Sequence, residues 1–216
     1  MTPLNESTHT MSHTNYTHIT IILDRSGSME SIRDATIAGF NAFLHAQRTV
    51  PGKATLTLVQ FDSLDSYEVV HRFRSSQEVP DLTHDTFVPR HGTPLLDALG
   101  RGINDLEQGL NALAEADKPE RVITAIITDG AENASREFTK TMIVDRIAEK
   151  RNDGWQFVFL RADLSAIHEA RDLGVDRNST FAFEKDEAGT TEAWTTLSRT
   201  TADLRRRRSK RELPSS

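Results

Sequence analysis

Short apolar runs rich in β-branched residues alternate along this chain with longer segments in which apolar residues have a helical spacing. The runs HITIILD and RVITAIITD are almost uninterrupted by polar residues, which is typical of strands buried on both faces of a sheet. We expect strands over residues 18–24, 54–62, 67–73, 121–129, 155–162 and 179–183. We expect helices over residues 31–47, from Pro94 to 113, and over 137–154, 165–174 and 187–208.

Strands that alternate with helical crossovers predict an α/β fold, here a doubly wound, mainly parallel six-stranded sheet with helices on both faces. The third strand, 67–73, is the exception. Only four residues separate it from the strand at 54–62, which is too few for a crossover. We therefore expect 67–73 to be an antiparallel edge strand.

Length and composition limit the other possibilities. A chain of 216 residues suits one domain, and the absence of cysteine excludes disulfides, thiolate metal sites and a catalytic cysteine. Its N-terminus lacks the pattern of a secretion signal, and no apolar run reaches the roughly 18 residues of a membrane helix. We expect a cytoplasmic protein with a disordered segment at 1–16, a domain at 17–204 and a basic tail at 205–216.

Charge is distributed unevenly along the chain. The net charge is −6, but the run RRRRSKR at 205–211 carries six positive charges, so the remainder sums to −12. Such an acidic body argues against a nucleic-acid-binding protein. The basic run is most often a solvated helix end, favoured by the helix dipole, although it can also contact RNA or an acidic partner.

Oxygen-bearing side chains follow two of the predicted central strands. Asp24, Ser26 and Ser28 alternate in DRSGS after the first strand, and Asp129 ends the strand at 121–129. Thr93 stands in HGTP, just before a predicted helix. Because ligands of α/β sheets collect at the carboxyl ends of the strands, we expect these side chains to converge.

This set contains only oxygen donors, which suits Mg²⁺, Mn²⁺ or Ca²⁺ and disfavours zinc. Two carboxylates and three hydroxyls leave such a cation able to accept an anionic oxygen from outside. Simpler interpretations exist for three of the five members. Asp24 can be a turn or cap residue, Thr93 can cap the helix that begins at Pro94, and Asp129 before a glycine can form a plain turn.

The order D-x-S-x-S, a distant Thr and a later Asp is similar to the von Willebrand factor A family and its metal-ion-dependent adhesion site. The resemblance includes VQFD on the second strand and spans roughly residues 17–204. It implies a strand order of 3-2-1-4-5-6 and a Mg²⁺ ion bound directly by Ser26 and Ser28. Thr93 would bind directly or through water, while Asp24 and Asp129 would act through waters and anchor the serines. The signal-free form resembles bacterial intracellular members.

The resemblance implies a non-catalytic module in which the metal captures an Asp or Glu of a partner protein. The matching motifs contain no histidine, cysteine or lysine placed as a nucleophile or base. One alternative is a metal-dependent phosphohydrolase or phosphotransfer protein, although the second acid of the hydrolases is replaced by Ser26 and no lysine can be assigned. A further alternative is an RNA-associated module that uses residues 205–211.

Overall fold

The computed structural model describes residues 15–162 and 173–207. The strands in this part of the chain are β1 (Thr17–Asp24), β2 (Ala54–Phe61), β3 (Glu68–Ser75), β4 (Arg121–Thr128), β5 (Gln156–Arg161) and β6 (Thr180–Ala182). The α-helices are α1 (Arg33–Thr49), α2 (Leu95–Asn111), α3 (Lys140–Asn152) and α5 (Glu187–Arg206). Short 3₁₀ helices are η1 (Gly27–Ile32), η2 (Glu115–Asp117) and η3 (Arg177–Ser179).

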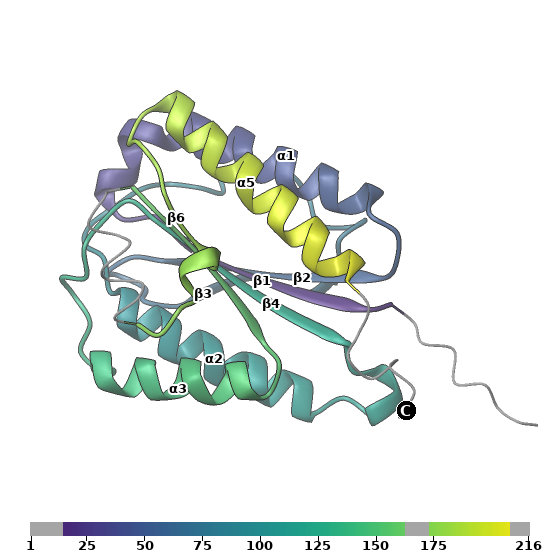
Figure 1. The fold of residues 1–216 in the computed structure, drawn as a ribbon. Coiled ribbons are helices and arrows are strands. Elements are labelled where there is room, and N and C mark those ends of the chain that lie inside the picture. The colour runs from purple at the N-terminus through teal and green to yellow at the C-terminus, as the bar shows by residue number, and fades with distance from the viewer. Residues whose placement is uncertain (1–14, 163–172, 208–216) are drawn as a thin grey trace, which may run out of the picture.

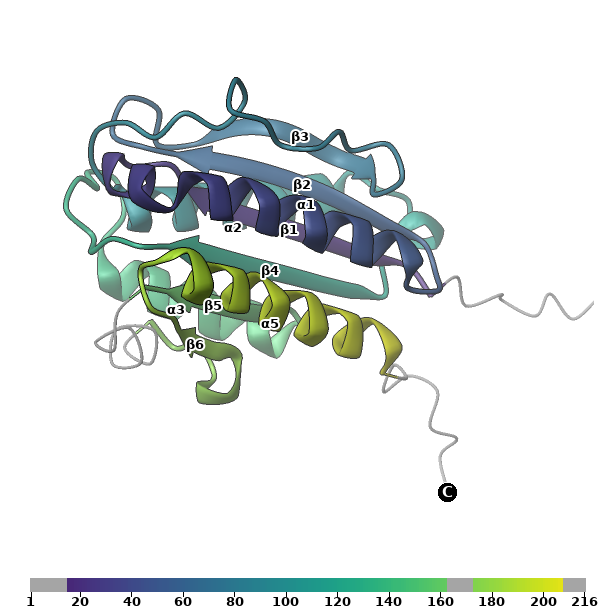
Figure 2. The ribbon, with the colours of Figure 1, turned by 90° about the horizontal axis from the view of Figure 1, so that it is seen from above.

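The strands form one six-stranded sheet in the order β3-β2-β1-β4-β5-β6 (Figure 2). All neighbouring pairs are parallel except β2 and β3, which are antiparallel. The predicted α/β class, the single antiparallel edge strand and the strand order implied by the resemblance are therefore confirmed.

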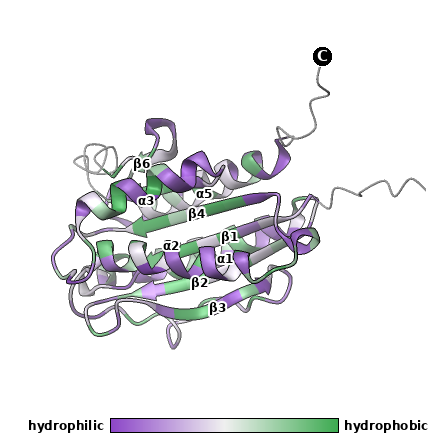
Figure 3. Cartoon of the chain, turned by 90° about the horizontal axis from the view of Figure 1, so that it is seen from below, coloured by the Kyte–Doolittle hydropathy of each residue, from purple (hydrophilic) through white to green (hydrophobic). Residues whose placement is uncertain are grey.

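Helices cover both faces of the sheet, with α1 and α5 on one side and α2 and α3 on the other (Figure 1). Alternate residues of the central strands feed two hydrophobic cores. Ile21 and Leu23 of β1 pack with α1 and α5, whereas Ile22 packs with α2 and α3. This arrangement explains the continuous apolar runs, and β4 is accordingly coloured as largely hydrophobic in Figure 3.

The first residue of the basic run is buried, whereas the sequence predicts a solvated helix end. Arg205 and Arg206 complete the last turn of α5, and Arg205 is 2% exposed. Its guanidinium is buried against the carboxyl end of α1, where it donates to carbonyl oxygens of Gln47 and Val50. The prediction was wrong for this residue because its partners lie on a helix more than 150 residues away.

Several predicted segments lie outside the described residues. These are residues 1–14 of the N-terminal segment, most of the helix predicted at 165–174, and residues 208–216 of the tail. Within 15–162 and 173–207, none of the helices combines the length and the hydrophobicity that crossing a membrane requires.

Candidate metal centre

The candidate site lies where the direction of chain winding changes. From β1 the chain crosses through α1 to β2 on one side, whereas α2 leads to β4 on the other side of β1. Because α1 and α2 lie on opposite faces, the carboxyl ends of β1 and β4 form the topological switch point. Asp24 ends β1, and Asp129 directly follows β4.

Asp24 fixes the start of the loop after β1. Its side chain is fully buried, its Oδ1 accepts a hydrogen bond from the Ser26 backbone N–H at 2.7 Å, and its Oδ2 accepts one from Thr128 Oγ1 at 2.6 Å. Burial raises the pKa of Asp24 to about 6, and the hydrogen bonds from Thr128 and Ser26 oppose that rise. With both oxygens engaged inside the protein, Asp24 serves as an anchor between the two strand ends.

Ser26, Ser28 and Asp129 are joined by a chain of contacts. Ser28 Oγ donates to Asp129 Oδ1 at 2.6 Å, and Ser26 Oγ lies 3.1 Å from Ser28 Oγ. Since the one hydroxyl proton of Ser28 is used on Asp129, Ser26 is the donor in the second contact. The lone pairs of Ser26 therefore stay available to a cation.

Thr93 reaches the same place from the loop before α2. It is buried, its backbone N–H donates to Asn133 Oδ1 at 2.8 Å, and its carbonyl accepts from Asn133 N–H at 3.1 Å. A Cβ added to Gly130 would lie 2.9 Å from Thr93 Oγ1 and 3.6 Å from Ser28 Oγ. The two hydroxyls therefore converge beside Gly130, where only a glycine leaves them room.

The loop after Asp129 is held by two acids, Glu132 and Asp97. Glu132 accepts hydrogen bonds from the backbone N–H groups of Leu96 at 2.9 Å and Ser135 at 2.7 Å. Asp97 is 4% exposed and accepts three backbone N–H bonds from residues 136–138. Asp97 was missed because an aspartate in the first turn of a helix is an ordinary feature.

Asp62 directly follows β2, where it holds a turn and binds two arginines. Its Oδ2 accepts from Arg25 Nε at 2.6 Å and from Arg90 Nε at 2.8 Å, while its Oδ1 accepts from Leu64 N–H at 2.7 Å. Burial opposes ionisation of Asp62, but these hydrogen bonds outweigh it and lower the pKa. Asp62 thus fastens the loops before Ser26 and Thr93 to the end of β2.

Lys185 was not predicted and also reaches the site. It lies between β6 and α5, and its Nζ is 2.7 Å from Asp129 Oδ2. This contact is a charge contact without hydrogen-bond geometry, and Asp129 Oδ2 is buried without a hydrogen bond among the described residues. A single lysine in FEKDE carries no pattern that separates it from an exposed lysine.

The residues present fit a hard divalent cation. No group of three His, Cys, Asp or Glu side chains gathers as a metal site within 15–162 and 173–207, so carboxylates must be combined with hydroxyls. That combination is supplied by Asp24, Asp129, Ser26, Ser28 and Thr93. One buried carboxylate oxygen of Asp129 has no hydrogen-bond donor in the described part of the chain. Oxygen-only sets of this kind suit Mg²⁺, Mn²⁺ and Ca²⁺.

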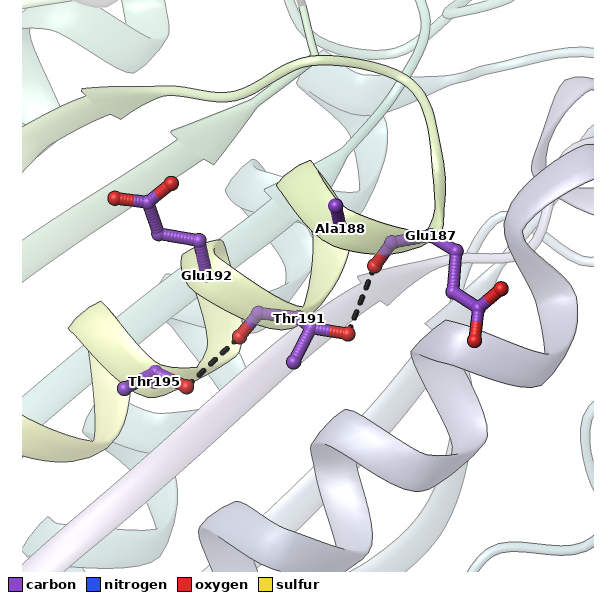
Figure 4. A pocket seen from close by; sticks show the side chains of 5 residues that line it. All are labelled: Glu187, Ala188, Thr191, Glu192 and Thr195. Carbon is purple, nitrogen blue, oxygen red and sulfur yellow. Dashed lines mark hydrogen bonds between the residues drawn. The ribbon is translucent and has the colours of Figure 1, made fainter.

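A separate hollow of about 600 Å³ lies along α5 (Figure 4). It is lined by Glu187, Ala188, Thr191, Glu192 and Thr195. The two threonine hydroxyls donate to backbone carbonyls one turn earlier in the helix, at 2.8 and 2.9 Å. None of the five predicted metal ligands lines this hollow, and its polar groups do not converge on a point.

No protein-family model and no curated protein matches the chain. Several solved structures do match it. Proximal thread matrix protein 1 from the mussel byssus was solved with zinc in its metal-ion-dependent adhesion site (MIDAS) motif. It is 15% identical over 88% of this chain and 48% of its own, with a TM-score of 0.61. A von Willebrand factor type A structure from Catenulispora acidiphila is 15% identical over 85% and 42%, with a TM-score of 0.55.

The pilus adhesin SpaC from Lactobacillus rhamnosus GG is 12% identical over 89% of this chain and 31% of its own, with a TM-score of 0.65. The chain thus spans less than half of each of these three structures. Identities this low establish the fold alone. The sheet order, the helical layers and these likenesses together show that the chain adopts the von Willebrand factor A fold.

Proposed function

We propose that this chain is a non-catalytic module that binds a partner protein through a divalent cation, with Mg²⁺ as the usual occupant. Ser26, Ser28 and Thr93 would bind the cation, while Asp24 and Asp129 anchor them. The observation that carries the proposal is the Ser26–Ser28–Asp129 chain, because it joins oxygens from the ends of β1 and β4. The zinc-occupied motif of the mussel protein supports a divalent metal at a site on this fold.

The residues of the chain perform two tasks in this proposal. Asp24 holds the Ser26 backbone, so that the hydroxyls of the loop are positioned before any ligand arrives. Asp129 accepts the hydrogen bond of the Ser28 hydroxyl, which leaves the outer lone pairs of the serines for a cation. When bound, a cation with mostly neutral ligands supplies a coordination position that a partner's Asp or Glu can fill.

One contact supports the phosphotransfer alternative, and others argue against it. Such proteins pair a strand-end aspartate with a lysine, and Lys185 is now available. However, the acceptor carboxylate of that chemistry must be reachable by a phosphoryl group, and Asp24 is fully buried with both oxygens hydrogen-bonded. Lys185 pairs with Asp129 and not with Asp24. These contacts favour binding over catalysis.

Carboxylate capture can be tested with two short peptides that have blocked ends, Gly-Asp-Gly and Gly-Asn-Gly. In the presence of Mn²⁺, which is paramagnetic, we expect the wild-type chain to broaden the side-chain proton signals of the Asp peptide and not those of the Asn peptide. Thr93→Val should reduce the effect because it removes one ligand hydroxyl while keeping the side-chain shape. One-dimensional proton NMR measures the line widths.

Equal broadening of both peptides, or full broadening with Thr93→Val, would contradict carboxylate capture at this site. Hydrolysis of para-nitrophenyl phosphate provides the companion measurement. We expect the wild type to show no more Mg²⁺-dependent turnover than Asp24→Asn. Turnover by the wild type that disappears in this variant would favour the phosphohydrolase alternative.

The expected cytoplasmic location and the boundaries of the 17–204 domain stay predictions.

A further inference from the structure

Lys185 stands on a short connection that is fastened at both ends. On the β6 side, Phe183 N–H donates to the carbonyl of Arg161 at 3.0 Å. On the α5 side, Asp186 caps the helix by accepting from Gly189 N–H at 2.7 Å. The backbone around Lys185 is therefore fixed near the carboxyl edge of the sheet, and its side chain extends from there to Asp129.

The electrostatic surroundings explain why an ammonium group settles at this point. The Asp129 side chain is fully buried, and its charge helps to raise the pKa of Asp24, so the two carboxylates are close enough to repel each other. A buried carboxylate without a counter-charge is costly. Among the described residues, Lys185 is the cation in contact with Asp129, although its own side chain is 38% exposed.

We propose that Lys185 is an internal counter-ion of the metal site and competes with the divalent cation for Asp129. Cation binding then requires displacement of the ammonium group, so the apparent metal affinity is lower than the intrinsic affinity of the oxygen ligands. Partner capture becomes linked to the position of the connection between β6 and α5. This inference rests on the proposed function, because it assumes that a cation binds to the hydroxyls beside Asp129 and is attracted by that carboxylate through water.

The test is isothermal titration calorimetry of the full chain with Mg²⁺ alone. Lys185→Met removes the ammonium and keeps most of the side-chain bulk, and we expect it to tighten Mg²⁺ binding by about tenfold, a typical coupling between competing groups. Lys185→Arg, which keeps a cation, should bind Mg²⁺ no more tightly than the wild type. Lys118→Met is the matched control, because Lys118 has similar exposure, 34%, and a 2.8 Å ion pair with Glu115.

Thermal melting gives a readout that does not depend on calorimetry. In EDTA, Lys185→Met should melt below the wild type because Asp129 loses its counter-ion, and saturating Mg²⁺ should remove or reverse this difference. Lys118→Met should show neither effect. Mg²⁺ binding that is normal in the wild type but unchanged or weaker in Lys185→Met would overturn the competition and leave the proposed metal site intact. Absence of Mg²⁺ binding in both proteins would overturn the proposed function, and this inference with it.

Discussion

Replacement of Arg205 by Met is expected to lower the free energy of unfolding by about 2–4 kcal/mol, because it leaves buried acceptors of the α1 terminus without donors. The guanidinium donates to Gln47 O at 2.7 Å and Gln47 Oε1 at 3.1 Å, and to Val50 O at 3.2 Å and Gly52 O at 3.3 Å. For a chain of this size the melting temperature should fall by about 5–12 °C.

The charge of Arg205 is stabilised by the carboxyl end of α1 and not, among the described residues, by a carboxylate. The four oxygens that accept hydrogen bonds from its guanidinium are neutral, and burial lowers the pKa of Arg205 below its usual value. The negative end of the α1 dipole lies at these carbonyls, since α1 ends at Thr49. Arg205→Lys should recover only part of the loss, because a lysine cannot reproduce the planar fork that reaches several carbonyls.

The neighbouring arginine is the control. Arg206 is on the same turn of α5, but its side chain is 62% exposed and lies 3.7 Å from Asp203. Arg206→Met should change the free energy of unfolding by less than about 0.5 kcal/mol. Urea denaturation of the three variants measures the differences, and equal losses for Arg205→Met and Arg206→Met would contradict a structural role of the buried guanidinium.

Asp24→Asn is expected to abolish any response to Mg²⁺ and, in EDTA at pH 8, to raise the free energy of unfolding by about 1–3 kcal/mol. The pKa of Asp24 is raised from 3.8 to about 6 by burial. Between these values the folded state binds more protons than the unfolded state, so stability falls as the pH rises from about 4 to 6. Above pH 6 the buried charge of Asp24 destabilises the folded state to its full extent. The neutral amide of Asp24→Asn removes this destabilisation.

Asparagine can also satisfy the partners of Asp24. Its amide oxygen can accept from Ser26 N–H, and its amide nitrogen can donate to Thr128 Oγ1, whose own proton can turn to the Gly130 carbonyl at 3.3 Å. The gain over wild type should shrink toward pH 4 in urea denaturation. Asp34→Asn, at a carboxylate that is 86% exposed, should show no such trend. A constant loss of stability across this range would contradict the assignment of Asp24 as a costly buried charge.

Much of the fold could be predicted because its signals are local or periodic. The apolar runs marked β1 and β4, and the four-residue gap after β2 identified β3 as antiparallel. Helix boundaries were less accurate where long-range contacts decide them. The helix predicted from residue 137 begins at Lys140, since the backbone before it is held by the carboxylate of Asp97.

The convergence of the five candidate residues could be predicted from the sequence, whereas the side chains that support them could not. Asp24, Ser26, Ser28, Thr93 and Asp129 follow predicted strands or precede a predicted helix, so topology alone places them at one edge. Lys185 makes one contact with the distant Asp129, and Asp97 accepts three hydrogen bonds from the distant residues 136–138. Such contacts leave no spacing pattern in the sequence. Arg205 belongs to the same class, because a buried arginine inside a basic run looks like its exposed neighbours.

The alternative role of the basic run in RNA binding stays a prediction. Arg205 is committed to the α1 terminus, and residues 208–211 lie outside the described part of the chain. Binding through phosphate contacts would weaken steeply with added salt, whereas binding through a metal would be lost in chelator. This difference separates the two kinds of partner without knowledge of their identity.

Thermal melting in EDTA and across a Mg²⁺ titration, for the wild type beside Asp129→Asn, tests the metal site most directly. A cation that binds only the folded chain stabilises it by about 2.7 kcal/mol at 100 times the dissociation constant. We expect the wild-type melting temperature to rise by about 5–10 °C and the variant to show no rise. No rise of the wild type in millimolar Mg²⁺, Mn²⁺ or Ca²⁺, or an equal rise in Asp129→Asn, would contradict a metal centre at the ends of β1 and β4.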